Sequence, residues 1–482
     1  MNFENKIMLI TYADSLGNNL KDLKKVLDTH FKGIIGGVHI LPFFPSTSDR
    51  GFAPTRYDVV AEEFGNWKDI TEIGESYYLM FDFMINHISA KSDYYVDYLQ
   101  KKDMSEYKDM FIRFDEVWPD GKYSQEDIDK IYKRKPRAPY IDATFSDGST
   151  DKIWCTFSED QIDIDVNTKV TKKLIVDTLL DMVRKNASII RLDAFAYAVK
   201  KAGTSCFFVE PEIWDILGET KDLLSPYGCI ILPEMHEHYN IQSKLAEKGY
   251  WVYDFALPML VLYSLFTGSG KRLKYWLSIC PRNQFTTLDT HDGIGVVDVK
   301  DLLTDDEIML TQELLFQKGA NVKRKYNTAE YNNLDVYQIN CTYYSALGNN
   351  DDAYLLARAI QFFAPGIPQV YYVGLLAGEN DIELLETTKN GRDINRHYYT
   401  LEEIDRNVER PVLRKMYSLM HFRNNYKAFD GECVIAETED KILEIKRNSA
   451  CFEAILRADL TTYEFCILYR GECGNMVELE IK

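Results

Sequence analysis

The sequence lacks the residue patterns that mark disulfide-bonded proteins and metalloproteins. Its nine cysteines are scattered without a C-x-x-C pair, and an odd number cannot close into a complete set of disulfides. His236 and His238 stand alone, without the H-x-x-x-H or Cys/His spacing of a metal site. We therefore expect reduced thiols and no bound metal ion.

Long apolar runs and an excess of positive charge are also missing. The longest apolar stretch, residues 255–266, is too short to span a bilayer and contains Pro258. Residues 1–15 include Glu4 and have no cleavage site typical of a signal peptide. The formal net charge of −19 argues against nucleic acid or an anionic membrane as a partner. These absences predict a cytoplasmic protein in which an anionic substrate needs a local basic patch.

The sequence does contain a regular alternation of strand and helix patterns. Helical patterns lie between apolar runs of strand length, which occupy 6–12, 37–41, 78–83, 189–193, 229–233, 250–255, 284–288 and 367–373. Eight strands that alternate with helices predict an α/β fold, a (β/α)8 TIM barrel.

Two polar excursions interrupt this alternation, and the chain ends in a different pattern. We expect the barrel to comprise residues 1–87, 168–292 and 354–428, with inserted subdomains at 88–167 and 293–353. Residues 429–482 alternate like antiparallel strands, which predicts a small C-terminal β-domain.

Charged residues lie at the ends of several predicted strands. The apolar run at 189–193 contains Arg191 and ends in Asp193, and both side chains point to the same face of an extended chain. The arginine can hold the aspartate ionised, so Asp193 is a candidate nucleophile, although a structural ion pair explains this stretch alone equally well. Other predicted strands lead to Asp82, Glu234 and Asp292. Because strand ends converge at one face of a barrel, these groups are expected to form one active site.

The order and spacing of these residues resemble the four signature regions of the α-amylase superfamily of glycoside hydrolases. The regions are Asp82-x-x-x-Asn86-His87, Arg191-x-Asp193, Glu234 and His291-Asp292. Longer stretches, among them GVHILPFFPSTSDRGFAPTRY at 37–57, RLDAFAYAVKK at 191–201 and LDTHDGIGV at 288–296, are similar to the sucrose phosphorylases within that superfamily. The resemblance runs from residue 5 to about residue 425.

The resemblance implies a retaining transfer of the glucosyl unit of sucrose to inorganic phosphate, which yields D-fructose and α-D-glucose 1-phosphate. Asp193 would form a covalent glucosyl ester, and Glu234 would act first as acid and then as base. Asp292 would hold sugar hydroxyls and stabilise the transition state. No cofactor is implied, because protonation creates the electrophile and a side chain is the nucleophile. A homodimer is expected by family analogy alone.

The resemblance also implies a set of substrate contacts. For glucose they are Asp49, Phe52, His87, Arg191, Tyr197, His236, His291 and Arg396, and for the acceptor they are Arg134, Lys135, Asp335, Tyr337 and Gln338. Core packing is an alternative for Phe52 and Tyr197. We interpret the basic cluster at 133–137 as part of the acceptor site and the cluster at 323–325 as solvated charge.

Other substrates and functions stay open at this point. Relatives that act on sucrose 6′-phosphate typically have a histidine where this chain has Tyr337, but they share Arg134, and residues 203–214 also resemble them. We favour sucrose as the substrate and keep sucrose 6′-phosphate as the alternative. A hydrolase or transglucosidase of the same superfamily and a non-enzymatic barrel are the remaining alternatives.

Overall fold

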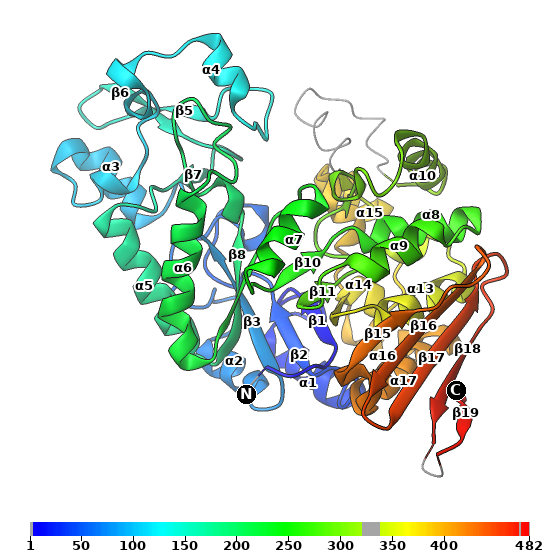
Figure 1. Cartoon of the computed structure of the whole chain (residues 1–482). Coiled ribbons are helices and arrows are strands. Elements are labelled where there is room, and N and C mark those ends of the chain that lie inside the picture. The colour runs from blue at the N-terminus through cyan, green and yellow to red at the C-terminus, as the bar shows by residue number, and fades with distance from the viewer. Residues whose placement is uncertain (1–2, 321–337, 472–473, 482) are drawn as a thin grey trace. The chain divides into compact units, whose positions relative to one another are not determined.

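The computed structural model describes residues 3–320, 338–471 and 474–481 (Figure 1). The chain forms two compact units, the first from residues 40–235 and the second from residues 3–39 and 236–482. Among the helices of these described ranges, none has both the length and the apolar character that crossing a membrane requires.

Eight parallel strands, divided between the two units, alternate with helices as a (β/α)8 barrel. In the first unit the hydrogen-bonded order is β3-β8-β9, and in the second it is β10-β11-β14-β1-β2. The strands are β1 (Met8–Thr11), β2 (Gly37–Ile40), β3 (Tyr78–Met84), β8 (Ala187–Asp193), β9 (Ile230–Pro233), β10 (Val252–Asp254), β11 (Gln284–Thr286) and β14 (Ile367–Tyr371). All eight coincide with predicted apolar runs, so the predicted fold class is confirmed.

Side chains cap the start of four of the five helices in the first unit. The first of these helices begins at Trp67, because Asn66 and Asp69 form a capping box ahead of it. This helix and the other four of the unit are α2 (Trp67–Gly74), α3 (Asp93–Lys101), α4 (Gln125–Lys130), α5 (Lys169–Arg184) and α6 (Glu212–Leu224).

The second unit contains most of the helices. They are α1 (Leu20–His30), α7 (Tyr239–Glu247), α8 (Leu257–Thr267), α9 (Lys271–Ile279), α10 (Asp305–Gln317), α12 (Tyr343–Ala346), α13 (Asp351–Phe363), α14 (Tyr372–Leu375), α15 (Ile382–Thr388), α16 (Leu401–Asn407) and α17 (Pro411–Asn425). Helix α13 carries no solvent-facing stripe over its last eleven residues, all of which are buried, whereas α1 buries only its apolar face.

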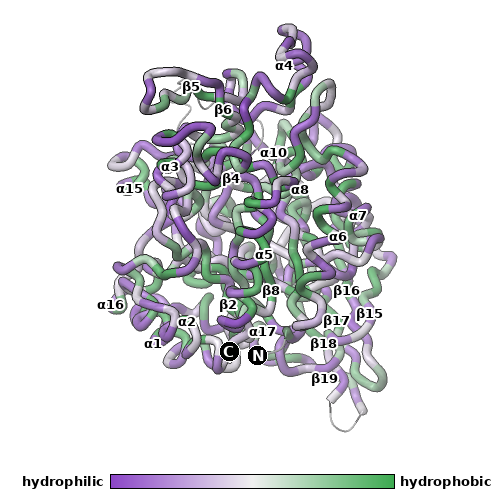
Figure 2. Tube along the Cα trace, turned by 90° about the vertical axis from the view of Figure 1, so that its left-hand side faces the viewer, coloured by the Kyte–Doolittle hydropathy of each residue, from purple (hydrophilic) through white to green (hydrophobic). Residues whose placement is uncertain are grey.

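The polar excursion of the first unit has its own aromatic core. Its strands pair as β4 (His87–Ser89) with β7 (Gln161–Asp163) and as β5 (Tyr140–Thr144) with β6 (Thr150–Trp154), both antiparallel. The rings of Phe114, Trp118 and Trp154 pack together in a buried cluster, while α4 is a hydrophilic segment, purple in Figure 2. Because β4 directly follows β3, this segment is tied to the end of a barrel strand.

The second unit contains two further antiparallel sheets. Residues of the second excursion form β12 (Ile294–Gly295), which pairs with β13 (Gln338–Ile339). The C-terminal sheet has the order β15-β16-β17-β18-β19, from β15 (Glu432–Ile435), β16 (Ile442–Ser449), β17 (Phe452–Asp459), β18 (Phe465–Arg470) and β19 (Met476–Glu478). It confirms the antiparallel pattern expected of the last residues, while the domain boundaries stay predictions.

Candidate active site

One buried arginine binds the carboxylates at the ends of two neighbouring strands in the first unit. Strands β3 and β8 are paired so that Asp82 lies opposite Arg191, and Asp193 follows on the same face. The Arg191 Nη1 donates to Asp82 Oδ1 at 2.5 Å and to Asp193 Oδ1 at 2.8 Å. The arginine and Asp82 are 3% and 0% exposed, so neither charge is screened by water. The strand pairing therefore builds the ion pair that the sequence predicts.

A third carboxylate joins this cluster from the next strand. Glu234 follows β9, and its Oε2 lies 3.7 Å from Arg191 Nη2 and accepts a hydrogen bond of 3.1 Å from the Ala194 amide. Ala194 adopts the left-handed conformation with φ 52°, which turns the chain sharply after Asp193. Three carboxylates thus surround one guanidinium.

This surplus of negative charge governs the titration of the cluster. Burial, together with the nearby Glu234 and Asp82 carboxylates, raises the pKa of Asp193 to about 8, while the Arg191 guanidinium opposes the rise. The titration belongs to the interacting group rather than to one side chain. The cluster therefore retains a proton near neutral pH, which is what an acid catalyst requires.

Aromatic rings and His87 lie next to each other at the start of the inserted segment. The His87 Nε2 donates to the Phe52 carbonyl at 2.9 Å, and the ring of Phe157 lies 5.4 Å from that of His87 and 5.1 Å from that of Tyr197. Burial lowers the pKa of His87, whereas the nearby Asp49 carboxylate acts in the opposite direction. The structure therefore brings four predicted glucose contacts into one region.

The four basic residues at 133–137, which are Lys133, Arg134, Lys135 and Arg137, line one small cavity with Tyr197. Burial raises the pKa of the Tyr197 hydroxyl, and the Arg134 guanidinium lowers it. Arg137 also donates to the carbonyls of Ala138 and Tyr140 at 3.0 and 2.8 Å and so supports the backbone.

In the second unit, cationic side chains surround Asp292. Arg392 Nη1 lies 3.2 Å from Asp292 Oδ1, and His291 Nε2 lies 3.5 Å from Oδ2. Burial opposes ionisation, but Arg392, His291, His236 and Arg396 hold the pKa of Asp292 far below its ordinary value. Asp292 is therefore a fixed anion, in contrast to Asp193.

Backbone contacts hold the loop that carries Asp292. The Arg396 Nε donates to the His291 carbonyl at 3.0 Å, and Asn395 Nδ2 donates to the Asp292 carbonyl at 3.0 Å. The Arg396 guanidinium also lies over the Tyr12 ring, 5.7 Å from its centroid. Arg396 is 1% exposed, so its side chain is held by these contacts and does not move freely in solvent.

Part of the predicted acceptor site falls outside the described residues. Asp335 and Tyr337 lie outside those residues, and so does the basic cluster at 323–325, which we interpret as solvated charge. Gln338 is described, and it is buried in β13 opposite Gly295.

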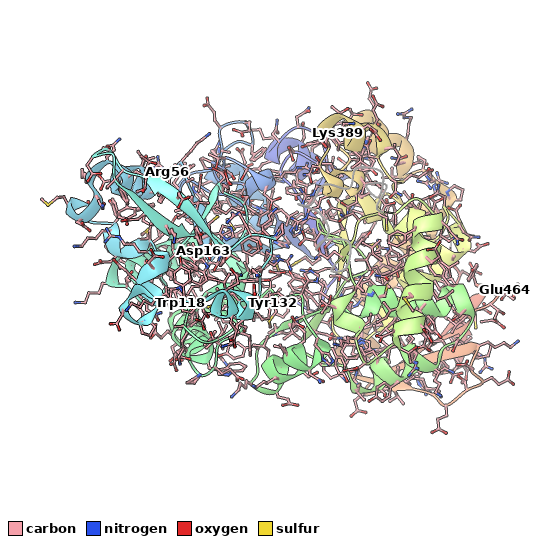
Figure 3. The ribbon with its side chains drawn as sticks, turned by 90° about the horizontal axis from the view of Figure 1, so that it is seen from above. Arg56, Trp118, Tyr132, Asp163, Lys389 and Glu464 are labelled. Atoms are coloured by element: carbon pink, nitrogen blue, oxygen red, sulfur yellow. The ribbon has the colours of Figure 1, made fainter. Side chains whose placement is uncertain are left out.

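Sequence reasoning missed two groups that contact the predicted site. Arg392 gave no signal of its own, because it lies in a polar stretch without periodicity. Asp163 (labelled in Figure 3) is fully buried and pairs with Lys200 at 2.7 Å, and Lys200 also donates to the Asn86 side chain at 2.5 Å. The only hint of this pair in the sequence is that Asp163 lies between the apolar residues Ile162 and Ile164.

Comparison with known proteins agrees with this geometry. Residues 11–248 match the family model of the α-amylase catalytic domain. A sucrose phosphorylase of Streptococcus mutans is 57% identical over 95% of both chains, and a sucrose 6(F)-phosphate phosphorylase of Thermoanaerobacterium thermosaccharolyticum is 45% identical over 99% of both. A crystal structure of a sucrose 6F-phosphate phosphorylase, also 45% identical, superposes with a TM-score of 0.95 over 99% of this chain and 98% of that one. The chain belongs to the α-amylase family, within its branch of sucrose phosphorylases and related phosphorylases.

Proposed function

We propose that this protein transfers the glucosyl unit of sucrose to inorganic phosphate, releasing D-fructose and forming α-D-glucose 1-phosphate. The observation that carries the proposal is the buried Arg191 cluster, in which one guanidinium orders a candidate nucleophile and a candidate acid/base. The 57% identity to a sucrose phosphorylase supports the same reaction.

In the first half-reaction, Asp193 attacks the anomeric carbon of glucose while the bond to the fructose oxygen breaks. Glu234 protonates that oxygen, so fructose leaves as a neutral molecule and a glucosyl–Asp193 ester forms. Arg191 binds Asp193 at 2.8 Å but lies 3.7 Å from Glu234. The guanidinium therefore orders Asp193 more closely, as suits the nucleophile, and leaves Glu234 in the role of acid and base.

In the second half-reaction, a phosphate oxygen attacks the anomeric carbon and the ester to Asp193 breaks. Glu234 takes up the proton of the attacking phosphate, which restores the starting state of the enzyme. A chain with a net charge of −19 needs local cations to attract phosphate. We assign this role to Arg134 and Lys135, which are two of the four basic residues that line the small cavity beside Tyr197.

Asp292 does not form a covalent bond in this scheme. As a fixed anion it accepts hydrogen bonds from glucose hydroxyls and balances the positive charge of the oxocarbenium-like transition state. We propose that the other contacts to the substrate come from Asp49, Phe52, His87, Tyr197, His236, His291 and Arg396, with Asp335, Tyr337 and Gln338 completing the acceptor site.

The experiment that tests this function measures fructose and α-D-glucose 1-phosphate produced from sucrose, with and without inorganic phosphate. Phosphate-dependent release of both products, lost in D193N, is the expected result. Release of free glucose at a rate indifferent to phosphate would contradict the proposal and indicate a hydrolase.

A second candidate substrate is sucrose 6′-phosphate. Arg134, together with Lys135, offers a cationic surface beside Tyr197, and a relative named for this substrate is 45% identical. Arg134→Gln distinguishes the candidates, because removing a phosphate-binding charge should reduce kcat/KM for sucrose 6′-phosphate by about 10-fold or more and that for sucrose much less. Turnover of plain sucrose at least as fast as that of the phosphorylated sugar in the unmodified enzyme would exclude this candidate as the main substrate.

A cytoplasmic location and a homodimeric assembly belong to the proposal as predictions from the sequence. So do the boundaries of the inserted subdomains at 88–167 and 293–353.

A further inference from the structure

A buried carboxylate in the second unit contacts a predicted substrate residue but has no role in the scheme above. Asp298 lies in a single 3-10 turn, Val297–Val299, and is 2% exposed. Its Oδ2 lies 3.3 Å from Nδ1 of His236, which is 5% exposed. Within the described ranges, the other oxygen of Asp298 has no hydrogen-bond partner. Burying a carboxylate for one hydrogen bond is costly, so a purely structural reason for this residue is weak.

The His236 ring is held from a second side by stacking. Its centroid lies 3.8 Å from that of the Phe255 ring, with 15° between the ring planes, and the centroid of Phe255 in turn lies 4.7 Å from that of Tyr253, also with 15° between the planes. The stack fixes the plane of the imidazole, but it leaves rotation within that plane undetermined. The bond to Asp298 determines that rotation.

Chemistry also fixes which nitrogen of the ring carries a proton. An ionised carboxylate only accepts hydrogen bonds, so the Nδ1 of His236 must be protonated to bond Asp298. A nitrogen of the same ring lies within 4.8 Å of a carboxylate oxygen of Asp292. The imidazole therefore lies between the buried Asp298, to which it is hydrogen-bonded, and Asp292, which is proposed to hold glucose.

The neighbouring glycine shows that the space around this pair is filled. A Cβ added at Gly295 would lie 1.9 Å from Asp298 Oδ2 and 3.3 Å from His236 Nδ1. Gly295 also pairs with Gln338 in the β12–β13 sheet. Any side chain at position 295 would thus displace the carboxylate from the histidine.

We propose that Asp298 is a positioning residue for glucosyl transfer, which holds His236 in one tautomer and one orientation next to Asp292. The proposal rests on the proposed function, because His236 and Asp292 act there on the glucosyl unit. Asp298 touches no substrate and acts only through the histidine.

Two substitutions test the pair in different ways, and a third is the control. Asp298→Asn removes the charge, and Gly295→Ala keeps the charge but pushes it off His236. The exposed pair formed by His238 and Asp301, at 2.9 Å with Asp301 70% exposed, joins the same two segments of the chain, so Asp301→Asn is a matched control. Losing the carboxylate partner of a metal-ligating histidine typically costs about 10–100-fold in activity. By analogy, we expect both test variants to lose about 10-fold or more in kcat/KM and the control to lose less than about 2-fold.

A double substitution separates positioning from a role in stability. His236→Phe keeps the stack on Phe255 but removes the ring nitrogens. If Asp298 acts only through the histidine, adding Asp298→Asn to His236→Phe should cost no further activity. An equal loss in both backgrounds would show that Asp298 supports the fold rather than the histidine.

Nitrogen-15 NMR of the histidine rings reads the tautomer directly and needs no activity. The expected spectrum has His236 protonated at Nδ1 in the unmodified enzyme and in Asp301→Asn, and a changed nitrogen shift in Asp298→Asn and Gly295→Ala. Full activity of both test variants, or a His236 signal that neither one alters, would refute the positioning role. An unmodified enzyme that lacks phosphorolysis but shows the expected signals would instead refute the proposed function and leave the contact between the two side chains intact.

Discussion

Replacing the nucleophile should make the protein inactive and more stable at once. At 1.36 kcal/mol for each pH unit, a carboxyl group whose pKa moves from 3.8 to about 8 lowers the free energy of unfolding by about 4 kcal/mol at pH 7. Asp193→Asn removes this penalty, and the attraction to Arg191 is already included in it, because the guanidinium is one of the causes of the net pKa. The gain of about 4 kcal/mol corresponds to an increase in Tm of about 4 °C for a chain of 482 residues.

The stability gained by Asp193→Asn should depend on pH, and this dependence can be tested. The folded protein keeps a proton on this group that the unfolded chain releases above pH 3.8. Stability of the unmodified protein therefore falls as pH rises from about 4 to about 8, and the asparagine variant lacks this contribution. Thermal melts of both proteins between pH 4 and pH 8 should show a difference in Tm that is near zero at pH 4 and grows towards pH 8. A variant that is less stable at pH 7, or a difference in Tm that does not change with pH, would refute the reasoning. The activity of Asp193→Asn should fall by about 10⁴-fold.

Two further substitutions address the charges that the sequence did not identify. Arg392→Gln removes the cation that lowers the pKa of Asp292 most. The acid limb of the pH profile of kcat/KM should therefore move to higher pH. An unchanged acid limb would contradict the role of Arg392 in keeping Asp292 ionised. Lys200→Met leaves Asp163 buried without its ion pair and should lower the free energy of unfolding in urea by about 3–5 kcal/mol. Lys201→Met is the control, because its ion pair is exposed, and a loss there above about 1 kcal/mol would mean that burial does not set the difference.

Local sequence patterns were enough to predict the strands and one part of the candidate site. Strand ends in a parallel sheet are brought together by the fold itself, so Asp82, Arg191 and Asp193 could be expected to meet once the apolar runs were recognised as strands. The start of α2 likewise follows from the neighbouring Asn66 and Asp69, which cap it. Periodicity and capping are properties of neighbouring residues, which is why they can be read from one sequence.

The remaining contacts depend on residues far apart in the sequence. Arg392 reaches Asp292 across about a hundred residues, and His236 reaches Asp298 across about sixty, and no local period marks either pair. The basic run at 133–137 was interpreted as one acceptor cluster, yet Arg137 binds backbone carbonyls while Arg134 adjoins Tyr197. The sequence gives the number of arginines in this run. Only their burial and their hydrogen-bond partners distinguish an arginine that supports the backbone from one that can bind a substrate.

The two groups of strand-end side chains have opposite charge balances, and the chemistry follows from that difference. In the first unit, three carboxylates share Arg191, and burial raises the pKa of Asp193 until a proton stays on the cluster near neutral pH. In the second unit, Arg392 and its cationic neighbours keep Asp292 ionised despite its burial. A double displacement needs both states together, because the proton must be transferred to the leaving oxygen while a permanent anion offsets the charge that develops on the sugar. The net charge of −19 does not show this difference between the two groups. The difference depends on where each arginine lies and not on how many arginines there are.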